Sequence, residues 1–362
     1  MNILIQMSHP AHFHLYKNVA KNLMDAGHQV FILIKTKDIL EDLLKASGLP
    51  YCNILQEAHR KTKLGIFVDM LVRDWRMLRF VRQHHIDLLT GSTAEVAQVG
   101  WLTHRYRINT GEDDMKVVPL FQKMAGPFIQ TMLSPVSCDN GKLESKTIHY
   151  DGFHKLAYLH PNQFTPDKQV VEKYFSAEKP YFILRFAQLK AYHDIAAEAR
   201  GINTEIAQRL IDQLSLHGDV YITSERALEP QFEKYRLNIN PLDIHHVLAF
   251  ATLYVGDSQS MAVEAAMLGT PSVRFNDFAG KIGVLEELEH KYQLTYAIPS
   301  KEPEKLYAKV EELLSLPKLS ETFQQRRQDM LSEKIDVTAF FSWFIENYPA
   351  SRNNYGLYAT KV

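Results

Sequence analysis

The sequence predicts an α/β protein built from two doubly wound parallel-sheet domains, and three observations support this fold class. The chain has 362 residues, a length that suits about two domains. Short apolar runs alternate with amphipathic helical patterns in two successive series. A segment with two prolines, residues 161–167, separates the two series. We therefore expect two domains that face each other across a cleft.

The first series begins with a strand–helix–strand unit. Residues 3–7 form a short branched-aliphatic run, which predicts a buried strand. Apolar side chains then recur at helical spacing, namely Tyr16, Val19, Ala20 and Leu23. Gly27 is expected to end this helix, and residues 29–35 form the next expected strand. Because two parallel strands need a crossover connection, this unit favours a parallel sheet.

The remaining elements continue the alternation. In the first domain we expect helices at 39–46 and 64–84 and strands at 87–91 and 106–108. In the second we expect strands at 181–186, 220–224, 253–256 and 272–275, with helices at 203–217, 243–249 and 261–268. Helices at 303–316, 321–334 and 337–347 are expected to pack outside or to return to the first domain. The expected domains are residues 1–165 and 166–335, followed by a C-terminal helix and tail at 336–362.

Composition excludes several classes of protein. The 41 Lys and Arg residues balance 42 Asp and Glu residues, which argues against a nucleic-acid binder. Cys52 and Cys138 lie far apart and form no C-x-x-C, so neither a disulfide framework nor a zinc site is expected. The first apolar run is too short for a signal peptide, and no apolar stretch of about 18 residues occurs. We expect a cytoplasmic protein, at most peripheral on a membrane.

The loop and helix at residues 255–264 are the strongest candidate for ligand binding. A small polar loop follows a strand, and either Ser258 or Ser260 caps the helix that also contains Gln259. The free N–H groups and positive dipole of such an N-terminus favour a phosphate. Glu264 lies one to two turns further on, where its carboxylate is suited to ribose hydroxyls. An ordinary capped helix with a solvent-facing Glu gives the same pattern.

Three histidines follow the first strand. His12 is the candidate base for an acceptor hydroxyl, because the ordinary imidazole pKa of about 6.5 suits neutral pH. His9 and His14 are candidates to orient His12 or to bind phosphate, although His14 also fits simple packing on its helix. The H-x-x-H-x-H spacing lacks a carboxylate or thiolate partner, so no metal is expected.

Two more loops of the first domain carry polar groups at strand ends. Ser92 lies in the segment 91–95, and Glu112 begins an acidic run, 112–114. Both offer hydrogen bonds to a sugar or its phosphate, although acidic runs are more often solvated turns. On the expected helix at 64–84, arginines recur every third position, namely Arg73, Arg76, Arg79 and Arg82, near Trp75. Such a helix suits an anionic lipid surface, or else a solvated face with acidic partners.

The residues at 257–271 resemble a known signature. The series Asp257-Ser258, Glu264-Ala265, Gly269 and Pro271 is similar to the donor-nucleotide stretch of GT-B glycosyltransferases of the MurG type. It also resembles the corresponding stretch of UDP-N-acetylglucosamine 2-epimerases, which share that fold of two Rossmann-like domains. In both groups the Glu five residues before the Gly binds the uridine ribose, and Glu264 stands five before Gly269.

Other segments extend this resemblance. Residues 8–14 are similar to the Gly-Gly-His segment of MurG-like transferases, with His12 on the matching position. Related enzymes place an acidic residue at the strand end where Glu112 stands, which implies a catalytic role for it. The chain also resembles an uncharacterised prokaryotic family that begins His-Pro-Ala-His, here 9–12, and carries Tyr-Leu-His-Pro-Asn, here 158–162.

In GT-B enzymes the loop after the first strand of the second domain faces the donor diphosphate. The resemblance therefore implies that Arg185, at the end of that strand, binds the diphosphate with two N–H groups. Pairing of Arg185 with a neighbouring carboxylate is the alternative. Further candidates are Ser224 for the base or ribose, Lys281 for phosphate, and Lys190, His193 and Asp194 after the strand.

The resemblance implies a glycosyltransferase that moves a sugar from a nucleotide-diphosphate donor, expected to be UDP-linked, to a cell-envelope or surface-polysaccharide acceptor. The acceptor is a glycan or a lipid-linked glycan, and no metal or other cofactor is expected. A 2-epimerase-like isomerase or hydrolase is the alternative, although Gln259-Ser260 replaces the glycine pair of the epimerases and their Gly-Thr-Arg-Pro-Glu motif is absent. A non-catalytic nucleotide-sugar binding protein is a third possibility.

Overall fold

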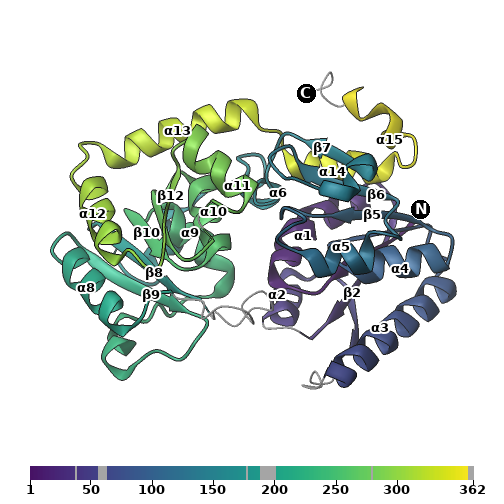
Figure 1. The fold of residues 1–362 in the computed structure, drawn as a ribbon, viewed down its shortest axis with the longest axis horizontal. Helices are drawn as coiled ribbons and strands as arrows, with labels where there is room; N and C mark the ends of the chain where they lie inside the picture. The colour runs from purple at the N-terminus through teal and green to yellow at the C-terminus, as the bar shows by residue number, and fades with distance from the viewer. Residues whose placement is uncertain (37–38, 56–62, 177, 188–200, 279, 358–362) are drawn as a thin grey trace. The chain divides into compact units, whose positions relative to one another are not determined.

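The computed structural model describes residues 1–36, 39–55, 63–176, 178–187, 201–278 and 280–357, without the side chains of 55 and 63–70. The chain divides into two compact units (Figure 1). Unit 1 comprises Met1–Gln163 and Lys334–Val362, and unit 2 comprises Phe164–Glu333. The chain therefore leaves unit 1 once and returns to it.

Unit 1 contains a seven-stranded parallel sheet with the order β3-β2-β1-β4-β5-β6-β7. The strands are β1 (Asn2–Met7), β2 (Gln29–Lys35), β3 (Tyr51–Leu55), β4 (Leu88–Gly91), β5 (Tyr106–Thr110), β6 (Thr131–Pro135) and β7 (Thr147–Tyr150). The sequence did not predict β3, β6 or β7. All three mix polar residues into four or five positions, so they lack the apolar run that reveals a buried strand.

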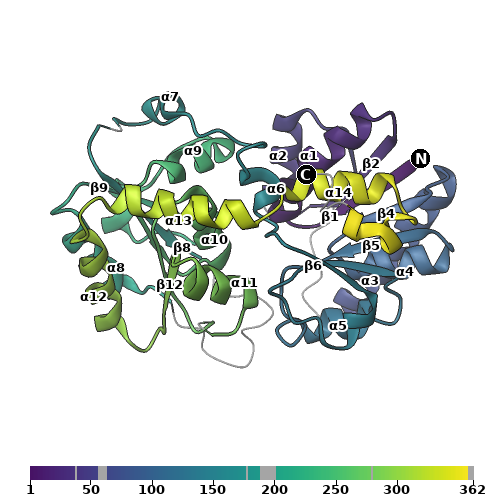
Figure 2. The ribbon, with the colours of Figure 1, turned by 90° about the horizontal axis from the view of Figure 1, so that it is seen from above.

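Two groups of helices accompany this sheet. One consists of α1 (Pro10–Asp25), α2 (Leu40–Ser47), α6 (Leu156–Leu159) and α14 (Val337–Glu346), in which α1 contacts the other three (Figure 2). The second consists of α3 (Lys63–Gln83), α4 (Ala94–Leu102) and α5 (Pro119–Ala125), in which α4 contacts the other two. The described part of the chain ends in the short helix α15 (Ser351–Asn354) and a 3₁₀ turn at Tyr355–Leu357.

Helix α1 forms as its sequence predicts. His9 occupies the N-cap, and Pro10 at the first helical position supplies a suitable φ without losing a needed N–H. The predicted apolar positions are buried, namely Tyr16, Val19, Ala20 and Leu23. Gly27 follows the helix at φ +85°, a left-handed conformation that glycine adopts without strain.

Unit 2 contains a five-stranded parallel sheet with the order β12-β11-β10-β8-β9. The strands are β8 (Tyr181–Phe186), β9 (Asp219–Ser224), β10 (Leu253–Gly256), β11 (Ser272–Phe275) and β12 (Thr295–Ile298). Its main helices are α7 (Lys168–Glu172), α8 (Thr204–Leu214), α9 (Ile244–Ala249), α10 (Gln259–Leu268), α11 (Gly283–Glu286), α12 (Pro303–Leu314) and α13 (Leu319–Glu333). Helices α8 and α12 are joined by Arg209 and Glu304, whereas α10 contacts α9 and α13.

Each sheet has a point at which the strand order reverses direction. In unit 1 it lies between β1 and β4, and in unit 2 between β8 and β10. Doubly wound sheets bind ligands beyond the carboxyl ends of the strands at such a point. The predicted doubly wound class is confirmed in both units, and each reversal shows where its ligand site is expected.

The arginines of α3 do not share one solvated face. Arg73 pairs with Glu95 of α4 at 2.9 Å, and Arg76 donates to the carbonyl of Ile54 at 2.7 Å. Side chains at every third position rotate gradually around a helix of 3.6 residues per turn. The first two arginines therefore point toward neighbouring elements of unit 1, and the last two point away from them. Arg79 and Arg82 remain exposed. Among the described residues, no helix is both long and apolar enough to cross a membrane.

Candidate functional site

Arg185 lies at the carboxyl edge of the unit 2 sheet, between two neighbouring strands. It is in register with Thr223 of β9 on one side and with Gly256 of β10 on the other. A Cβ atom on Gly256 would lie 2.5 Å from the Tyr254 hydroxyl and 2.8 Å from the Arg185 Cβ. Only glycine therefore allows the Arg185 side chain and the end of β10 to approach this closely.

Helix α10 begins immediately after Gly256 and Asp257. Ser258 is its N-cap by position, with φ −85° and ψ 122°, which settles the alternative between Ser258 and Ser260. In the part of the chain that the structure describes, the Ser258 side chain makes no capping hydrogen bond. The first-turn N–H groups, which begin at Gln259 and Ser260, therefore keep their positive potential for a ligand.

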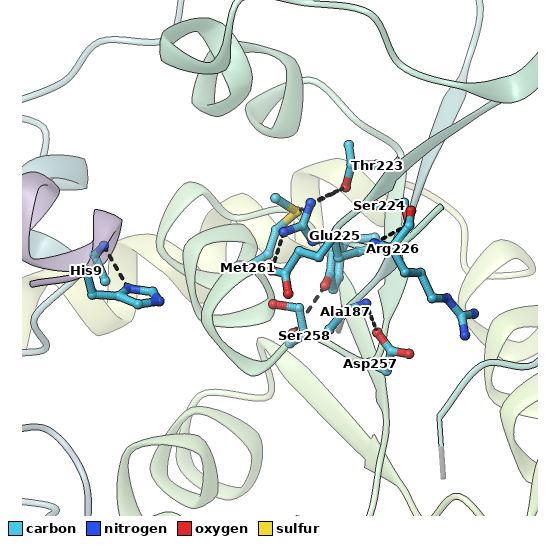
Figure 3. A network of polar contacts seen from close by, with 12 residues as sticks. His9, Ala187, Thr223, Ser224, Glu225, Arg226, Asp257, Ser258 and Met261 are labelled. Carbon is cyan, nitrogen blue, oxygen red and sulfur yellow. Dashed lines mark hydrogen bonds and ion pairs between the residues drawn. The ribbon is translucent and has the colours of Figure 1, made fainter. Parts of the chain in front are cut away.

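Asp257 is buried, and its carboxylate binds two backbone N–H groups. One oxygen accepts the N–H of Ala187 at 2.5 Å (Figure 3), and the other accepts the N–H of Ile202 at 3.3 Å. Asn276 donates to the Asp257 carbonyl at 3.3 Å. Burial raises the pKa of Asp257 to about 6, because the two N–H donors offset only part of the lost hydration.

The guanidinium of Arg185 has two described partners. Its Nη2 donates to a Glu225 carboxylate oxygen at 2.5 Å, and its Nη1 donates to the Thr223 hydroxyl at 3.2 Å. Figure 3 shows Thr223 and Glu225 together at the end of β9. The carboxylate pairing considered for Arg185 is therefore present, and the same side chain lies beside the start of α10.

Glu264 faces a buried histidine instead of open solvent. A carboxylate oxygen of Glu264 lies 3.4 Å from Nε2 of His245 in α9, and the two side chains are 13% and 5% exposed. The alternative of a solvent-facing Glu is therefore wrong. His245 fixes the direction of the carboxylate that the sequence assigns to the ribose, and no sequence motif pointed to this histidine.

The other residues predicted for unit 2 have local partners. The Ser224 hydroxyl donates to the Arg226 carbonyl at 2.7 Å and accepts the Arg226 N–H at 3.2 Å, so it shapes its own turn. Lys281 is exposed and donates to the Asp277 carbonyl at 2.7 Å. Lys190, His193 and Asp194 lie outside the described residues.

In unit 1, His9 and His12 lie at the N-terminus of α1, next to the reversal of strand order. The exposed His9 accepts the N–H of Ala11 at 3.1 Å through Nδ1. Nδ1 of the half-buried His12 lies 3.2 Å from the N–H of Ser8 and accepts from it. Burial, together with the charges of His9, His154 and two lysines, lowers the pKa of His12 to about 3. The ring is therefore neutral at physiological pH.

The Ser8 bond assigns the proton of the neutral His12 ring. Because Nδ1 accepts, the proton resides on Nε2, and Nε2 is a hydrogen-bond donor. A neutral imidazole held this way at a helix N-terminus polarises an oxygen instead of removing its proton. The base role predicted for His12 needs the other tautomer, in which Nδ1 carries the proton and the Ser8 bond is lost.

Glu112 is part of a half-buried charged group, not a solvated turn. One carboxylate oxygen accepts the Lys155 ammonium at 2.5 Å, and the other accepts the backbone N–H of His154 at 2.6 Å. Although burial opposes it, the Lys155 and His154 contacts hold the pKa of Glu112 below its ordinary value. Burial lowers the pKa of His154 to about 4. Sequence reasoning missed Lys155 and His154, because 42 or more residues separate them from Glu112.

Ser92 joins a chain of hydroxyl groups. Its Oγ lies 2.7 Å from Oγ1 of Thr110, which in turn lies 3.1 Å from the buried Tyr16 hydroxyl. His14 lies elsewhere, with its ring 5.0 Å from that of Tyr158 and 5.2 Å from that of Phe13. Two residues correspond to about 200° around a helix, so His14 and His12 face different directions.

The described part of the chain contains no site arranged for metal or sulfur chemistry. Among those residues, no group of three or more His, Cys, Asp or Glu side chains is placed to hold a metal ion. Cys52 and Cys138 are both free, and Cys138 is buried. Burial raises the pKa of the Cys138 thiol, so this group stays protonated at physiological pH.

Comparisons with solved structures confirm the GT-B fold. S. aureus MnaA in complex with UDP has a TM-score of 0.68 and 12% identity, over 98% of this chain and 97% of that one. UDP-GlcNAc 2-epimerase from Neisseria meningitidis bound to UDP-GlcNAc gives 0.64 and 13%, over 95% and 98%. The spinosyn rhamnosyltransferase SpnG complexed with thymidine diphosphate gives 0.63 and 12%, over 96% and 100%. No family model matches the chain, and no curated protein matches it.

Proposed function

We propose that the protein is a glycosyltransferase that transfers a sugar from a UDP-linked donor to a glycan or lipid-linked glycan of the cell envelope. One observation carries the proposal: Arg185 and the uncapped N-terminus of α10 adjoin the same strand end, and Glu264 lies further along the same helix. A nucleoside diphosphate has two features that match them. Its phosphates suit the guanidinium and the helix dipole, and its ribose hydroxyls suit a carboxylate.

In the proposed reaction the acceptor hydroxyl oxygen attacks the anomeric carbon of the donor. The bond between that carbon and the diphosphate oxygen breaks, and its electron pair leaves with the diphosphate. The N–H groups of α10 and the Arg185 guanidinium would stabilise the charge that develops on the leaving group. This step needs no metal or other cofactor, because protein groups supply the positive potential.

The acceptor proton must move to a base as the new bond forms. We propose that His12 contacts the acceptor oxygen through Nε2, at the N-terminus of α1. It removes the proton itself if acceptor binding drives the ring into its other tautomer. If the ring keeps its present tautomer, His12 orients the oxygen as a donor and the proton passes to Glu112. Glu112, the second candidate for catalysis, would need to exchange its Lys155 partner for a substrate group.

A 2-epimerase-like activity is the second candidate, favoured by the fold similarity to the Neisseria enzyme bound to UDP-GlcNAc. The two candidates separate when the protein is incubated with a panel of nucleotide sugars, first without acceptor. Slow release of UDP that an envelope acceptor accelerates supports the transferase. Release of free N-acetylmannosamine or interconversion of the donors contradicts it, and tight UDP binding without turnover indicates a binding protein.

Two variants test the assigned residues. Glu264→Ala should weaken UDP binding by about ten-fold or more, whereas Glu205→Ala, on the exposed surface of α8, should not. His12→Ala should abolish transfer while UDP affinity stays close to that of the unmodified protein. The exposed His217 provides the matched His217→Ala control. Equal loss of transfer and UDP affinity in His12→Ala would make His12 a donor-binding residue.

We further propose that a lipid-linked acceptor would be met in the cytoplasm at a membrane surface, through α3. Leu71 and Trp75 are 49% and 59% exposed, and Arg79 and Arg82 follow on the same helical face. Co-sedimentation with vesicles should increase with anionic lipid and decrease in the Trp75→Glu variant. Equal binding to neutral and anionic vesicles would contradict an electrostatic contact.

A further inference from the structure

The ion pair between Arg185 and Glu225 stands where the donor diphosphate is proposed to bind. Glu225 holds Nη2 of the guanidinium at 2.5 Å, and Thr223 holds Nη1 at 3.2 Å. Nε of Arg185 is buried and has no hydrogen-bond partner among the described residues. Two of the three guanidinium nitrogens are therefore occupied by protein groups.

A phosphate group binds a guanidinium best through two parallel N–H bonds. The end-on fork uses Nη1 and Nη2, and the side-on fork uses Nε and Nη2. Nη2 belongs to both forks, and Nη2 is the nitrogen that Glu225 holds. Because Nη2 carries two N–H groups, a phosphate that uses either fork shares this nitrogen with the Glu225 carboxylate, and the two negative groups then repel each other at close range.

The two partners of this ion pair differ in their freedom to move. The Arg185 side chain is 18% exposed and lies against Gly256, whereas the Glu225 side chain is 44% exposed. The Glu225 backbone is fixed by its N–H bond to the Phe186 carbonyl at 2.9 Å. The more exposed Glu225 carboxylate is thus the partner of this ion pair that is less costly to move.

We propose that Glu225 is an internal competitor, which occupies Arg185 in the empty site and is displaced by the diphosphate of the donor. This inference rests on the proposed function, because it takes Arg185 as the diphosphate ligand. The carboxylate keeps a largely buried guanidinium paired when no ligand is bound. Glu225 also sets a minimum negative charge for the ligand, because a group that replaces the carboxylate must interact with Arg185 more strongly than one carboxylate does.

The experiment measures binding of four probes to the full chain by calorimetry: UDP, UMP, uridine and inorganic pyrophosphate. Glu225→Gln should bind UDP and pyrophosphate about five-fold more tightly, the order expected when a partly exposed ion pair no longer competes. Uridine lacks phosphates, so its binding should not change. Glu233→Gln is the matched control, because Glu233 makes a comparable pair with Arg236 at 2.7 Å and is 47% exposed.

Unchanged or weaker binding of UDP to Glu225→Gln would overturn the inference. If uridine binding also weakened, Glu225 would be a contact of the nucleoside. The variant Arg185→Gln shows which hypothesis has failed: the competitor role of Glu225, or the binding of the diphosphate at Arg185. Unchanged UDP affinity in Arg185→Gln would defeat the placement of the diphosphate itself, whereas a large loss there with no gain in Glu225→Gln would defeat only the competitor.

Discussion

The carboxylate of Asp257 accepts the backbone N–H of Ala187 at 2.5 Å, so the residue after β8 is bound to the residue after β10. The same carboxylate accepts the N–H of Ile202 at 3.3 Å. Both strands border the reversal of strand order in unit 2. Asp257 thus positions the ends of β8 and β10. The N–H groups proposed to bind the diphosphate follow directly, at the start of α10.

This arrangement gives Asp257 a measurable effect on stability. Its pKa of about 6 in the folded chain exceeds the ordinary value of about 3.9. The folded state therefore binds the proton more tightly, so the contribution of Asp257 to the free energy of unfolding is fully present below pH 4. It is lost as pH rises through 6, by about 3 kcal/mol in total.

Urea unfolding of the unmodified chain and of Asp257→Asn, from pH 4 to 7.5, measures this contribution as the difference between them. Other titrating groups are common to both chains and cancel. The unmodified chain should lose about 3 kcal/mol relative to the variant over this range. A difference that stays flat, or that grows in the opposite direction, would show that Asp257 titrates normally.

Gly256→Ala should disrupt both stability and donor binding. The new Cβ would lie 2.5 Å from the Tyr254 hydroxyl and 2.9 Å from the Arg185 carbonyl, and the backbone atom cannot move aside cheaply. We expect a loss of about 1–3 kcal/mol and weaker UDP binding. Gly356→Ala is the control, because nothing lies within 4 Å of its added Cβ. Thermal unfolding together with UDP calorimetry tests both effects.

Glu112 and Lys155 should show strong energetic coupling. Their side chains are each 12% exposed, so removal of either charge leaves the other poorly solvated. Glu112→Gln and Lys155→Met should each destabilise by about 2–4 kcal/mol, and the double variant by less than their sum. A double-mutant cycle in urea measures the coupling, and additive losses would contradict it.

The same double variant tests whether Glu112 takes part in catalysis. If its stability recovers and transfer activity does not, the carboxylate acts on the substrate. Recovery of both would assign Glu112 and Lys155 to the framework of unit 1. The exposed Asp113 next to Glu112 offers the matched Asp113→Asn control, which should leave both properties unchanged.

The tautomer of His12 can be observed directly. We expect ¹⁵N chemical shifts of a protonated Nε2 and an unprotonated Nδ1 in the ligand-free protein, because Nδ1 accepts the Ser8 N–H. With a pKa of about 3, the ring should show no titration between pH 5 and 8. A midpoint near 6.5, or a proton on Nδ1, would contradict this state and favour the base role without rearrangement.

The alternation of strands and helices was predictable because periodicity survives in a single sequence. It revealed β1, β2, β4, β5 and β8–β11. Among these, β1, β8 and β10 are mostly apolar and buried. Short strands with polar residues, such as β7 (Thr147–Tyr150), left no such signal. The position of Arg185 and Ser258 at strand ends followed from the same pattern, since parallel strands place their carboxyl ends together.

The partners of the site residues were beyond prediction. Glu225 with Arg185, His245 with Glu264, and Lys155 with Glu112 are pairs formed by folding across distances that no local motif encodes. The tautomer of His12 depends on one backbone N–H, which a sequence pattern does not place. Sequence thus indicated which groups are available for chemistry, and the fold determined how each is charged, oriented or occupied.

The return of the chain to unit 1 has a consequence for its synthesis on the ribosome. Lys334 pairs with Asp151 at 2.5 Å, Asp336 caps α14, and α14 packs on α1. Unit 2 is continuous and can fold while the ribosome still holds the chain, whereas unit 1 must wait for residues 334–346. Until then the apolar surface of α1 that α14 will cover stays exposed, so the nascent chain is prone to aggregate during this interval.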